Sequence, residues 1–326
     1  MYPLKFNPIL KSIIWGGSQI ASFKNLPATD GVGESWEISG VSGDVSEVCN
    51  GALKGQSLTD LLEKDGENLL GKSLYKRFGN TFPLLIKFID ARTPLSIQVH
   101  PNDALAKQRH KTFGKTEMWY VVKAAAGASL YSGFRKPIDV EKYVQSLAND
   151  TFTDYLQNYK VKEGDVFFLP AGRVHAIGAG CFIAEIQQTS NITYRIYDYN
   201  RTDANGNPRE LHTDLAKDAI DYRVKSPEKD VLPITCPYFT TDIIEAQKGS
   251  RLTRSHNDTF VIYIGIKGGA TLTDASSISV TLRQGETVLV PAQNSNKITM
   301  ELSDETKLLE VYVPPCGTVL SPIFIF

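Results

Sequence analysis

The sequence predicts a mostly β protein that folds as two β-barrels, with helical insertions in its first half. Short runs of β-branched and aromatic residues, bounded by Gly, Pro, Asn or Asp, dominate the chain and are typical of antiparallel strands. A nine-residue pattern at 162–170 returns 121 positions later at 283–291. Two stretches interrupt the strand pattern with helical periodicity. The 326 residues, of which 42% are hydrophobic, are enough for two domains with buried cores.

The individual elements follow from these patterns in chain order. The clearest strands are expected at 84–89, 118–122, 165–169, 182–187 and 288–290. Helical spacing of apolar residues predicts insertions over 57–78 and 137–159, the second opened by a proline, and a weaker helix over 212–220. Residues 107–111, which include His110, are expected to form a basic surface turn.

The internal repeat divides the chain into two predicted domains. Besides the pattern at 162–170, residues 127–131 recur as 269–273, which is 142 positions later. The two offsets differ by 21 residues, close to the length of the helical insertion between 134 and 159. We place the boundary near Asp230, so that 1–230 form the metal-binding domain and 231–326 a second, degenerate one. No histidine follows Pro291 as His175 follows Pro170, and the second domain is therefore expected to hold no metal.

Four side chains form a candidate metal site. Residues 164–175 combine a glycine turn, an apolar strand, a Pro-x-Gly turn and His175. Gln98 and His100 lie two apart in a strand and point to the same side, and Glu117 follows in the next apolar run. Two imidazoles, one carboxylate and one amide oxygen suit zinc, and also cobalt, manganese or iron.

The spacing Gly-x5-Pro-x-Gly-x2-His resembles the second sequence motif of the cupin superfamily without a mismatch. The first cupin motif, His-x-His before a glutamate, appears here as Gln98-x-His100 with a longer gap to Glu117. This resemblance implies two cupin-type jelly-roll barrels. The departure in the first motif indicates a subfamily.

Four further segments are similar to those of type I mannose-6-phosphate isomerases and occur in the same order: 33–37, 97–103, 114–120 and 193–198. The resemblance runs from about Pro8 to Asp214, and the length matches the short bacterial form of that family. It implies interconversion of mannose 6-phosphate and fructose 6-phosphate through an enediol(ate) with one zinc ion. It also implies that Gln98, His100, Glu117 and His175 are ligands and that Arg195 is the catalytic arginine.

Basic side chains near these motifs are candidates for binding the 6-phosphate. Lys115 lies two residues before Glu117 and is expected on the same inward face, although a solvated strand-end lysine is an equal alternative from the residues alone. Lys87 and Arg92 are further candidates, because basic donors suit phosphate oxygens. For Arg195, in a strand-like aromatic run, the alternative is a structural salt bridge with Asp198 or Glu185.

Composition excludes several kinds of partner. The 35 Lys and Arg residues nearly balance the 36 Asp and Glu, and no basic stripe of the kind that binds nucleic acid or anionic membranes is present. No signal-like apolar segment opens the chain, and we expect a cytoplasmic protein. Cys49, Cys181, Cys236 and Cys316 are far apart, which fits reduced thiols. Oligomeric state is not predicted.

Two other functions compete with the isomerase. A non-catalytic cupin that binds a sugar or a small acid would use the same fold, because fold does not fix function. A metal-dependent dioxygenase would need two histidines and one carboxylate, which this set also contains. The presence of all four ligands together with Arg195 favours the isomerase over the first, and Gln98 argues against the second.

Overall fold

The computed structural model describes residues 1–199, 201–202 and 206–315, and antiparallel sheets are its main regular structure. Two sheets belong to the first two-thirds of the chain. The first, in spatial order, consists of β1 (Ile9–Gly17), β2 (Val32–Ile38), β5 (Leu84–Ala91), β12 (Cys181–Gln188), β7 (Glu117–Ala124) and β10 (Val166–Leu169). The second consists of β13 (Tyr194–Tyr197), β6 (Ile97–Val99), β11 (His175–Ile177), β8 (Ser129–Phe134) and β9 (Leu156–Lys160).

Two more sheets follow later in the chain. One consists of β14 (Ile234–Thr235), β15 (Thr240–Ala246), β22 (Thr306–Tyr312), β17 (Val261–Lys267) and β20 (Thr287–Val290). The other consists of β16 (Arg251–Arg254), β21 (Ile298–Leu302), β18 (Gly269–Thr273) and β19 (Ser279–Arg283), and a short pair joins β3 (Gly40–Val41) to β4 (Asp44–Val45). The mostly β prediction and all five expected strands are confirmed. The pairings of the described strands give open sheets, and a closed barrel is not among them.

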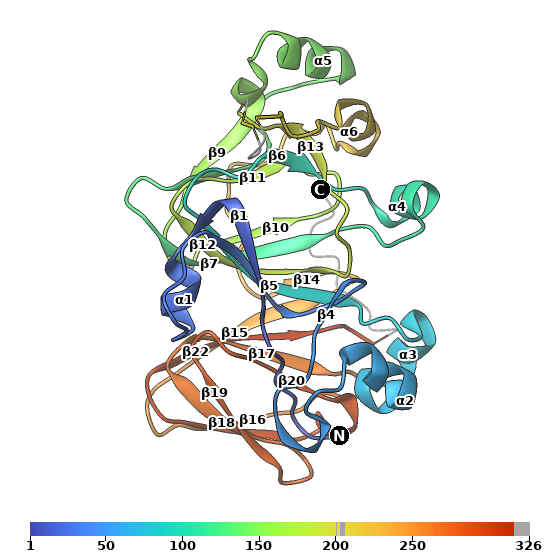
Figure 1. The fold of residues 1–326 in the computed structure, drawn as a ribbon, viewed down its shortest axis with the longest axis vertical. Helices are drawn as coiled ribbons and strands as arrows, with labels where there is room; N and C mark the ends of the chain where they lie inside the picture. Colours follow the sequence, from blue (N-terminus) through green and yellow to red (C-terminus); the bar gives the residue numbers. More distant parts are fainter. Residues whose placement is uncertain (200, 203–205, 316–326) are drawn as a thin grey trace.

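The four large sheets stack as layers, with the later strands at the lower end of Figure 1. Alternation along the strands fills the space between the layers, because successive side chains point to opposite faces. In β12, Ile183 packs in the core between the first two sheets, whereas Phe182 and Ala184 pack toward the later half. In β17, Ile262 packs in the same cluster of side chains as Phe182 and Ala184, in the core between the two halves of the chain, which we call the interface core. Its neighbour Tyr263 faces the four-stranded sheet instead.

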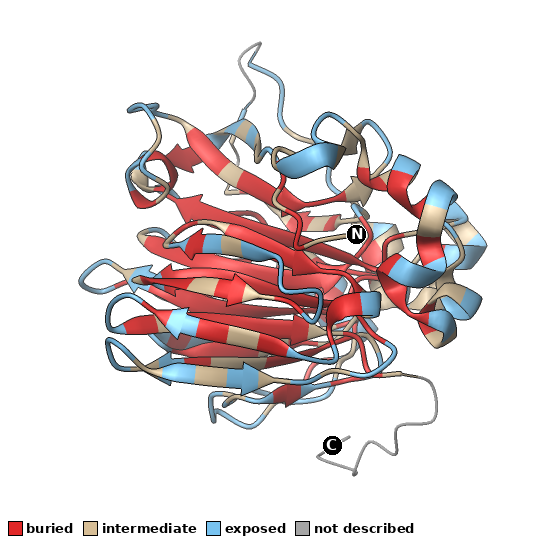
Figure 2. Ribbon diagram, turned by 90° about the horizontal axis from the view of Figure 1, so that it is seen from below, coloured by how far each residue is buried: buried red, intermediate tan, exposed pale blue. Residues whose placement is uncertain are grey.

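Buried side chains therefore run continuously through the stack, and exposed ones concentrate on the helices and the outermost strands (Figure 2). The interface core also contains helix α2 (Leu58–Leu70) and residues near the N-terminus, where Leu4 bridges to Leu289. Burying each such Leu, Ile or Phe contributes about 1.5–3 kcal/mol. The two halves are thus joined by a large apolar contact.

The helices partly follow the predictions. The expected insertion over 57–78 forms α2 and α3 (Lys72–Phe78), separated by Gly71, whose φ of 95° suits a residue without a Cβ. The expected helix over 137–159 is shorter: α5 (Val140–Ala148) and a 3-10 turn (Phe152–Tyr155) give way to β9, because residues 156–160 pair with β8. The weaker helix is present as α6 (Thr213–Ala219).

Two helices and two 3-10 turns were not predicted. The expected basic turn at 107–111 is wrong, because these residues lie at the end of α4 (Asp103–His110), which Asn102 caps by accepting from the N–H of Leu105. The others are α1 (Gln19–Phe23) and the 3-10 turns Gly51–Leu53 and Ala292–Asn294.

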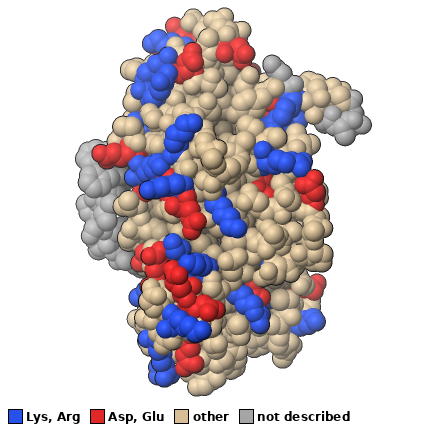
Figure 3. Space-filling view, turned by 90° about the vertical axis from the view of Figure 1, so that its left-hand side faces the viewer, with Lys and Arg blue, Asp and Glu red and all other residues tan. Residues whose placement is uncertain are grey.

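The surface carries mixed charge. On the face drawn in Figure 3, basic and acidic side chains alternate without a large area of one sign. No helix within the described ranges has the length and apolar character needed to cross a membrane. Cys49, Cys181 and Cys236 are free thiols, and Cys316 lies outside the described residues.

Candidate metal centre

His100, Glu117 and His175 come together inside the first pair of sheets. Glu117 begins β7, His175 begins β11, and His100 directly follows β6. One donor atom from each of the three lies within 4.8 Å of the others, and all three residues are buried. Nε2 of His175 lies 3.3 Å from Oε1 of Glu117, and Nε2 of His100 lies 3.5 Å from Oε2. This donor set can hold a divalent metal ion.

The outer nitrogen of each imidazole is already used. Nδ1 of His100 lies 2.9 Å from the carbonyl oxygen of Ile192, and Nδ1 of His175 lies 2.8 Å from that of Arg173. A carbonyl oxygen can only accept, so each Nδ1 carries the proton and each Nε2 presents a lone pair to the centre. Nε2 of His175 and Oε1 of Glu117 are buried without a hydrogen-bond partner in the described structure, as expected for metal ligands.

The protonation states also suit metal binding. Burial, helped by the nearby charge of Lys115, lowers the pKa of His100 to about 3. Burial likewise lowers the pKa of His175. Burial alone would raise the pKa of Glu117, but the charge of Lys115 holds it well below the usual range. At neutral pH the centre therefore consists of two neutral imidazoles and one carboxylate, which need to lose no proton before they bind a metal.

Gln98 and Lys115 lie beside the three. In the sheet, Gln98 is paired with His175 on one side and with Arg195 on the other. Nζ of Lys115 lies 2.7 Å from Oε2 of Glu117 and 3.1 Å from Nε2 of His100, and the side chain is 6% exposed. The alternative of a solvated lysine is therefore wrong. Its ammonium lies next to two of the donor atoms.

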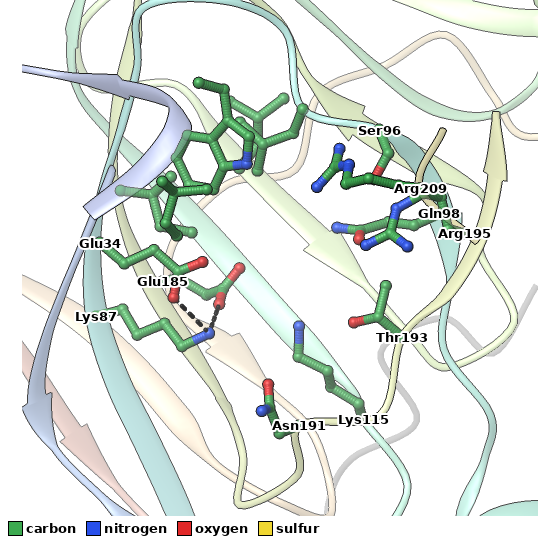
Figure 4. Close-up of a pocket in the computed structure, with 15 residues that line it drawn as sticks. Glu34, Lys87, Ser96, Gln98, Lys115, Glu185, Asn191, Thr193, Arg195 and Arg209 are labelled. Atoms are coloured by element: carbon green, nitrogen blue, oxygen red, sulfur yellow. Dashed lines mark ion pairs between the residues drawn. The ribbon is translucent and has the colours of Figure 1, made fainter. Parts of the chain in front are cut away.

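A cavity of about 340 Å³ opens beside this centre, which is within the usual size of small-molecule sites. Each of the four segments that carried the sequence resemblance contributes at least one lining residue. Figure 4 shows polar and charged groups converging on this space from several strands and from the segments between them: Glu34, Lys87, Ser96, Gln98, Lys115, Glu185, Asn191, Thr193, Arg195 and Arg209.

Lys87 is held at one wall between two carboxylates. Its Nζ lies 3.4 Å from Oε2 of Glu34 and 3.4 Å from Oε1 of Glu185, the two pairs drawn as dashed lines in Figure 4. Burial opposes the charge, but these two neighbours raise the pKa of Lys87. Burial and the charge of Glu117 raise the pKa of Glu185, which also accepts from the indole N–H of Trp119 at 2.9 Å. Sequence reasoning missed both carboxylates, although each lies in a motif or a predicted strand.

Arg195 lies on the opposite side of the cavity. It makes neither of the two alternative salt bridges: Nη1 donates to the carbonyl oxygen of Glu210 at 2.9 Å, and Asp198 is paired with Arg201 and Arg209 instead. Burial and the nearby charge of Arg209 lower the pKa of Arg195. Arg209, which sequence reasoning also missed, adds a second guanidinium to the lining of the cavity.

The predicted basic residues thus separate into two groups. Lys115 and Lys87 line the cavity, but Arg92 does not. Nη1 of Arg92 lies 3.0 Å from Asp30, and its side chain is 53% exposed.

Comparison with known proteins fits this geometry. Residues 4–120 match the family model described as phosphomannose isomerase type I, catalytic domain. The mannose-6-phosphate isomerase ManA of Bacillus subtilis is 39% identical over 220 residues, which cover 67% of this chain and 68% of that protein. This chain belongs to the type I phosphomannose isomerase family.

Two further comparisons extend the similarity along the chain. The putative mannose-6-phosphate isomerase YvyI of the same organism is 31% identical over 302 residues, 89% of this chain and 93% of that one. The crystal structure of the mannose 6-phosphate isomerase from Bacillus subtilis superposes with a TM-score of 0.84 at 28% identity, covering 95% of this chain and 99% of that one. The type I phosphomannose isomerase fold therefore extends over the second half as well.

Proposed function

We propose that this protein interconverts mannose 6-phosphate and fructose 6-phosphate as a metal-dependent aldose–ketose isomerase. The observation that carries the proposal is a buried His-Glu-His donor set that lies beside a cavity lined by two arginines, two lysines and two carboxylates. Family membership supports the reaction type, and the relatives are named for the same substrate.

The residues fit one divalent ion, and we propose zinc. His100, Glu117 and His175 would hold it through Nε2, the carboxylate and Nε2, with the amide oxygen of Gln98 as the fourth donor. Imidazole and carboxylate ligands are typical of catalytic zinc sites, which keep a position open toward the substrate. When bound, such an ion acts as a Lewis acid that stabilises negative charge on a sugar oxygen.

The side chains of the chain itself supply the remaining needs of the reaction. A proton must move between C1 and C2, and the enediol(ate) formed meanwhile carries negative charge. Arg195 is our proposed catalytic arginine, because its guanidinium faces the cavity and can stabilise that charge. Lys115 and Lys87 are proposed to bind the substrate, and their burial strengthens their attraction for an anion. For Arg92 the proposed phosphate contact has the least support, since it lies outside this cavity.

The decisive experiment measures conversion of mannose 6-phosphate to fructose 6-phosphate by purified protein, before chelation, after chelation, and after zinc is restored. We expect turnover to disappear and then return. Arg195→Lys should lose most turnover while keeping its metal, whereas Arg223→Lys, at an exposed position paired with Asp221, should behave like the parent protein. Absence of turnover in fully metallated protein would reject the isomerase and leave the non-catalytic sugar- or acid-binding cupin as the function.

We also propose that residues 1–230 and 231–326 are two cupin-type jelly-roll domains, the first catalytic and the second degenerate. The division of the large sheets supports this, because strands up to β13 form two of them and strands from β14 form the other two. A cytoplasmic location is likewise a proposal, which the free thiols support.

A further inference from the structure

A second polar cavity, of about 380 Å³, lies in the later half of the chain. It opens between β15, β16 and β22. The residues that matter for its chemistry are Asp242, Arg254, His256, Glu310 and Tyr312. None of them contributes to the cavity described above.

Strand register shows that this cavity corresponds to the first one. In the first half, Glu185 on β12 is paired with Trp119 on β7 and with Lys87 on β5. In the second half, Glu310 on β22 is paired with Tyr263 on β17 and with Asp242 on β15. The sequence repeat gives the same correspondence. Trp119 is paired with Phe167, and Tyr263 is paired with Val288. Phe167 and Val288 lie 121 positions apart, which is the offset of the repeat.

The facing sheets correspond in the same way. Leu130 and Leu272 occupy the same place in the second repeat pattern. Leu130 is paired with Ile177, and Leu272 with Met300. Two residues earlier on these partner strands lie His175 and Ile298. Because residues two apart in a strand point to the same side, His175 points to the same side as Ile177, and Ile298 to the same side as Met300.

From that anchor the metal-ligand positions can be compared. His175 is paired with Gln98, and Ile298 with Arg254. Arg254 therefore stands where the first half has Gln98, and His256 stands where it has His100.

The remaining ligand position changes character. Glu117 is paired with Leu169, and Val261 with Val290, which lies 121 positions after Leu169. Val261 thus replaces Glu117, just as Ile298 replaces His175. Aliphatic side chains at two of the ligand positions remove the metal donors but leave the polar wall of the cavity in place.

In that wall, three side chains surround the carboxylate of Glu310, and Arg254, whose side chain is 40% exposed, is the most exposed of them. Glu310, whose side chain is 7% exposed, accepts from the hydroxyl of Tyr263 at 2.8 Å and lies 3.2 Å from Nε2 of His256. Nε of Arg254 lies 3.7 Å from the same carboxylate oxygen, and it is buried without a hydrogen-bond partner in the described structure. Because burial of unsatisfied polar groups is costly, this donor is expected to have a ligand or water as its partner.

We propose that this cavity binds a small uncharged polyhydroxy compound, such as a free monosaccharide, without a metal. Sugar hydroxyls both donate and accept, and the cavity offers carboxylate acceptors in Asp242 and Glu310 beside the guanidinium donor of Arg254. The ring of Tyr312 supplies an apolar surface for the C–H groups of a sugar.

Charge disfavours a phosphorylated ligand here. The positive charge of Arg254 is already offset by Glu310, and Asp242 adds a second negative charge at the same wall. A phosphate group would therefore meet net repulsion. In the first cavity, by contrast, two lysines and two arginines outnumber the two lining carboxylates, Glu34 and Glu185.

The test uses calorimetric titration of the metallated full-length protein with D-mannose, in an Arg195→Lys background to weaken any contribution from the catalytic cavity. We expect saturable binding that weakens at least tenfold in both Arg254→Met and Asp242→Asn. Arg251→Met is the matched control, because Arg251 lies on the same strand, is 71% exposed and pairs with Glu301. It should bind like the parent.

Isomerase turnover measured in the otherwise unchanged protein separates the two sites. Arg254→Met and Asp242→Asn should leave it intact. Three results would overturn the proposal: no saturable mannose binding, equal weakening by Arg251→Met and Arg254→Met, or tighter binding of mannose 6-phosphate than of mannose at this site. Thermal unfolding of each variant checks that the fold is retained, and Asp242→Asn, at a half-buried position, provides a second variant if Arg254→Met unfolds.

Discussion

Replacing Lys115 by methionine should have opposite effects on two properties: the stability of the metal-free protein and its affinity for metal. Without a metal, the ammonium is the cation that pairs with Glu117, at 2.7 Å and almost completely buried. With a metal, the same ammonium competes for that carboxylate and repels the incoming ion. Lys115→Met should therefore destabilise the metal-free protein and tighten metal binding.

The distance sets the magnitudes. At an effective dielectric constant of about 20, two unit charges 2.7 Å apart attract by about 6 kcal/mol before desolvation is counted. Removing one partner of a buried pair costs about 3–5 kcal/mol, and here the cost is limited because Glu117 can take up a proton. If repulsion by the ammonium costs the incoming ion a quarter of that gross attraction, the cost is about 1.5 kcal/mol. Removing the ammonium then tightens metal binding about tenfold, since about 1.4 kcal/mol is a factor of ten.

Denaturant unfolding of the chelated proteins measures the first effect, and competition with a fluorescent zinc chelator measures the second. Lys123→Met is the control, because Lys123 lies at an exposed position on β7, the strand that Lys115 precedes by two residues. Turnover should also fall in Lys115→Met if this residue binds substrate. Weaker zinc binding in Lys115→Met than in Lys123→Met would refute the competition argument, as would unchanged stability of the chelated protein.

Three further changes have defined outcomes. His175→Asn should reduce zinc per chain, measured by mass spectrometry, to below about a tenth of the parent value, because it removes one of three clustered donors; full zinc content would contradict the site. Lys87→Met should destabilise the protein by about 3–5 kcal/mol in urea, because Glu34 and Glu185 lose their shared cation, and adding Glu185→Gln should recover part of the loss. Asp258 accepts from two N–H groups at the start of α3, so Asp258→Ala should cost about 1 kcal/mol and Asp258→Asn less. Burial opposes the ionised form of Asp258, but those bonds lower its pKa. Its contribution to folding stability should therefore be complete above the ordinary carboxyl pKa and should fade as pH falls through the lower pKa of the folded protein. Equal costs of Asp258→Ala at pH 7 and pH 2 would contradict this.

Local patterns were sufficient for the five expected strands and for the residue types that cluster as His100, Glu117 and His175. Alternation with period two places Gln98 and His100 on one side of a strand, and the glycine and proline turns fix where His175 emerges. Helix ends were predicted less well. Residues 156–160 continue a helical pattern, but they pair with β8, and long-range pairing outweighs local propensity.

The sequence by itself therefore determined the kind of chemistry, because the identity and spacing of the donors are local properties of the chain. Only the tertiary structure decided that Lys115 contacts Glu117 and His100, that Lys87 lies between Glu34 and Glu185, and that Arg209 joins Arg195 at the same cavity. These contacts join strands that are far apart in the chain. Their register depends on the packing of whole sheets, which the sequence around any one residue does not contain.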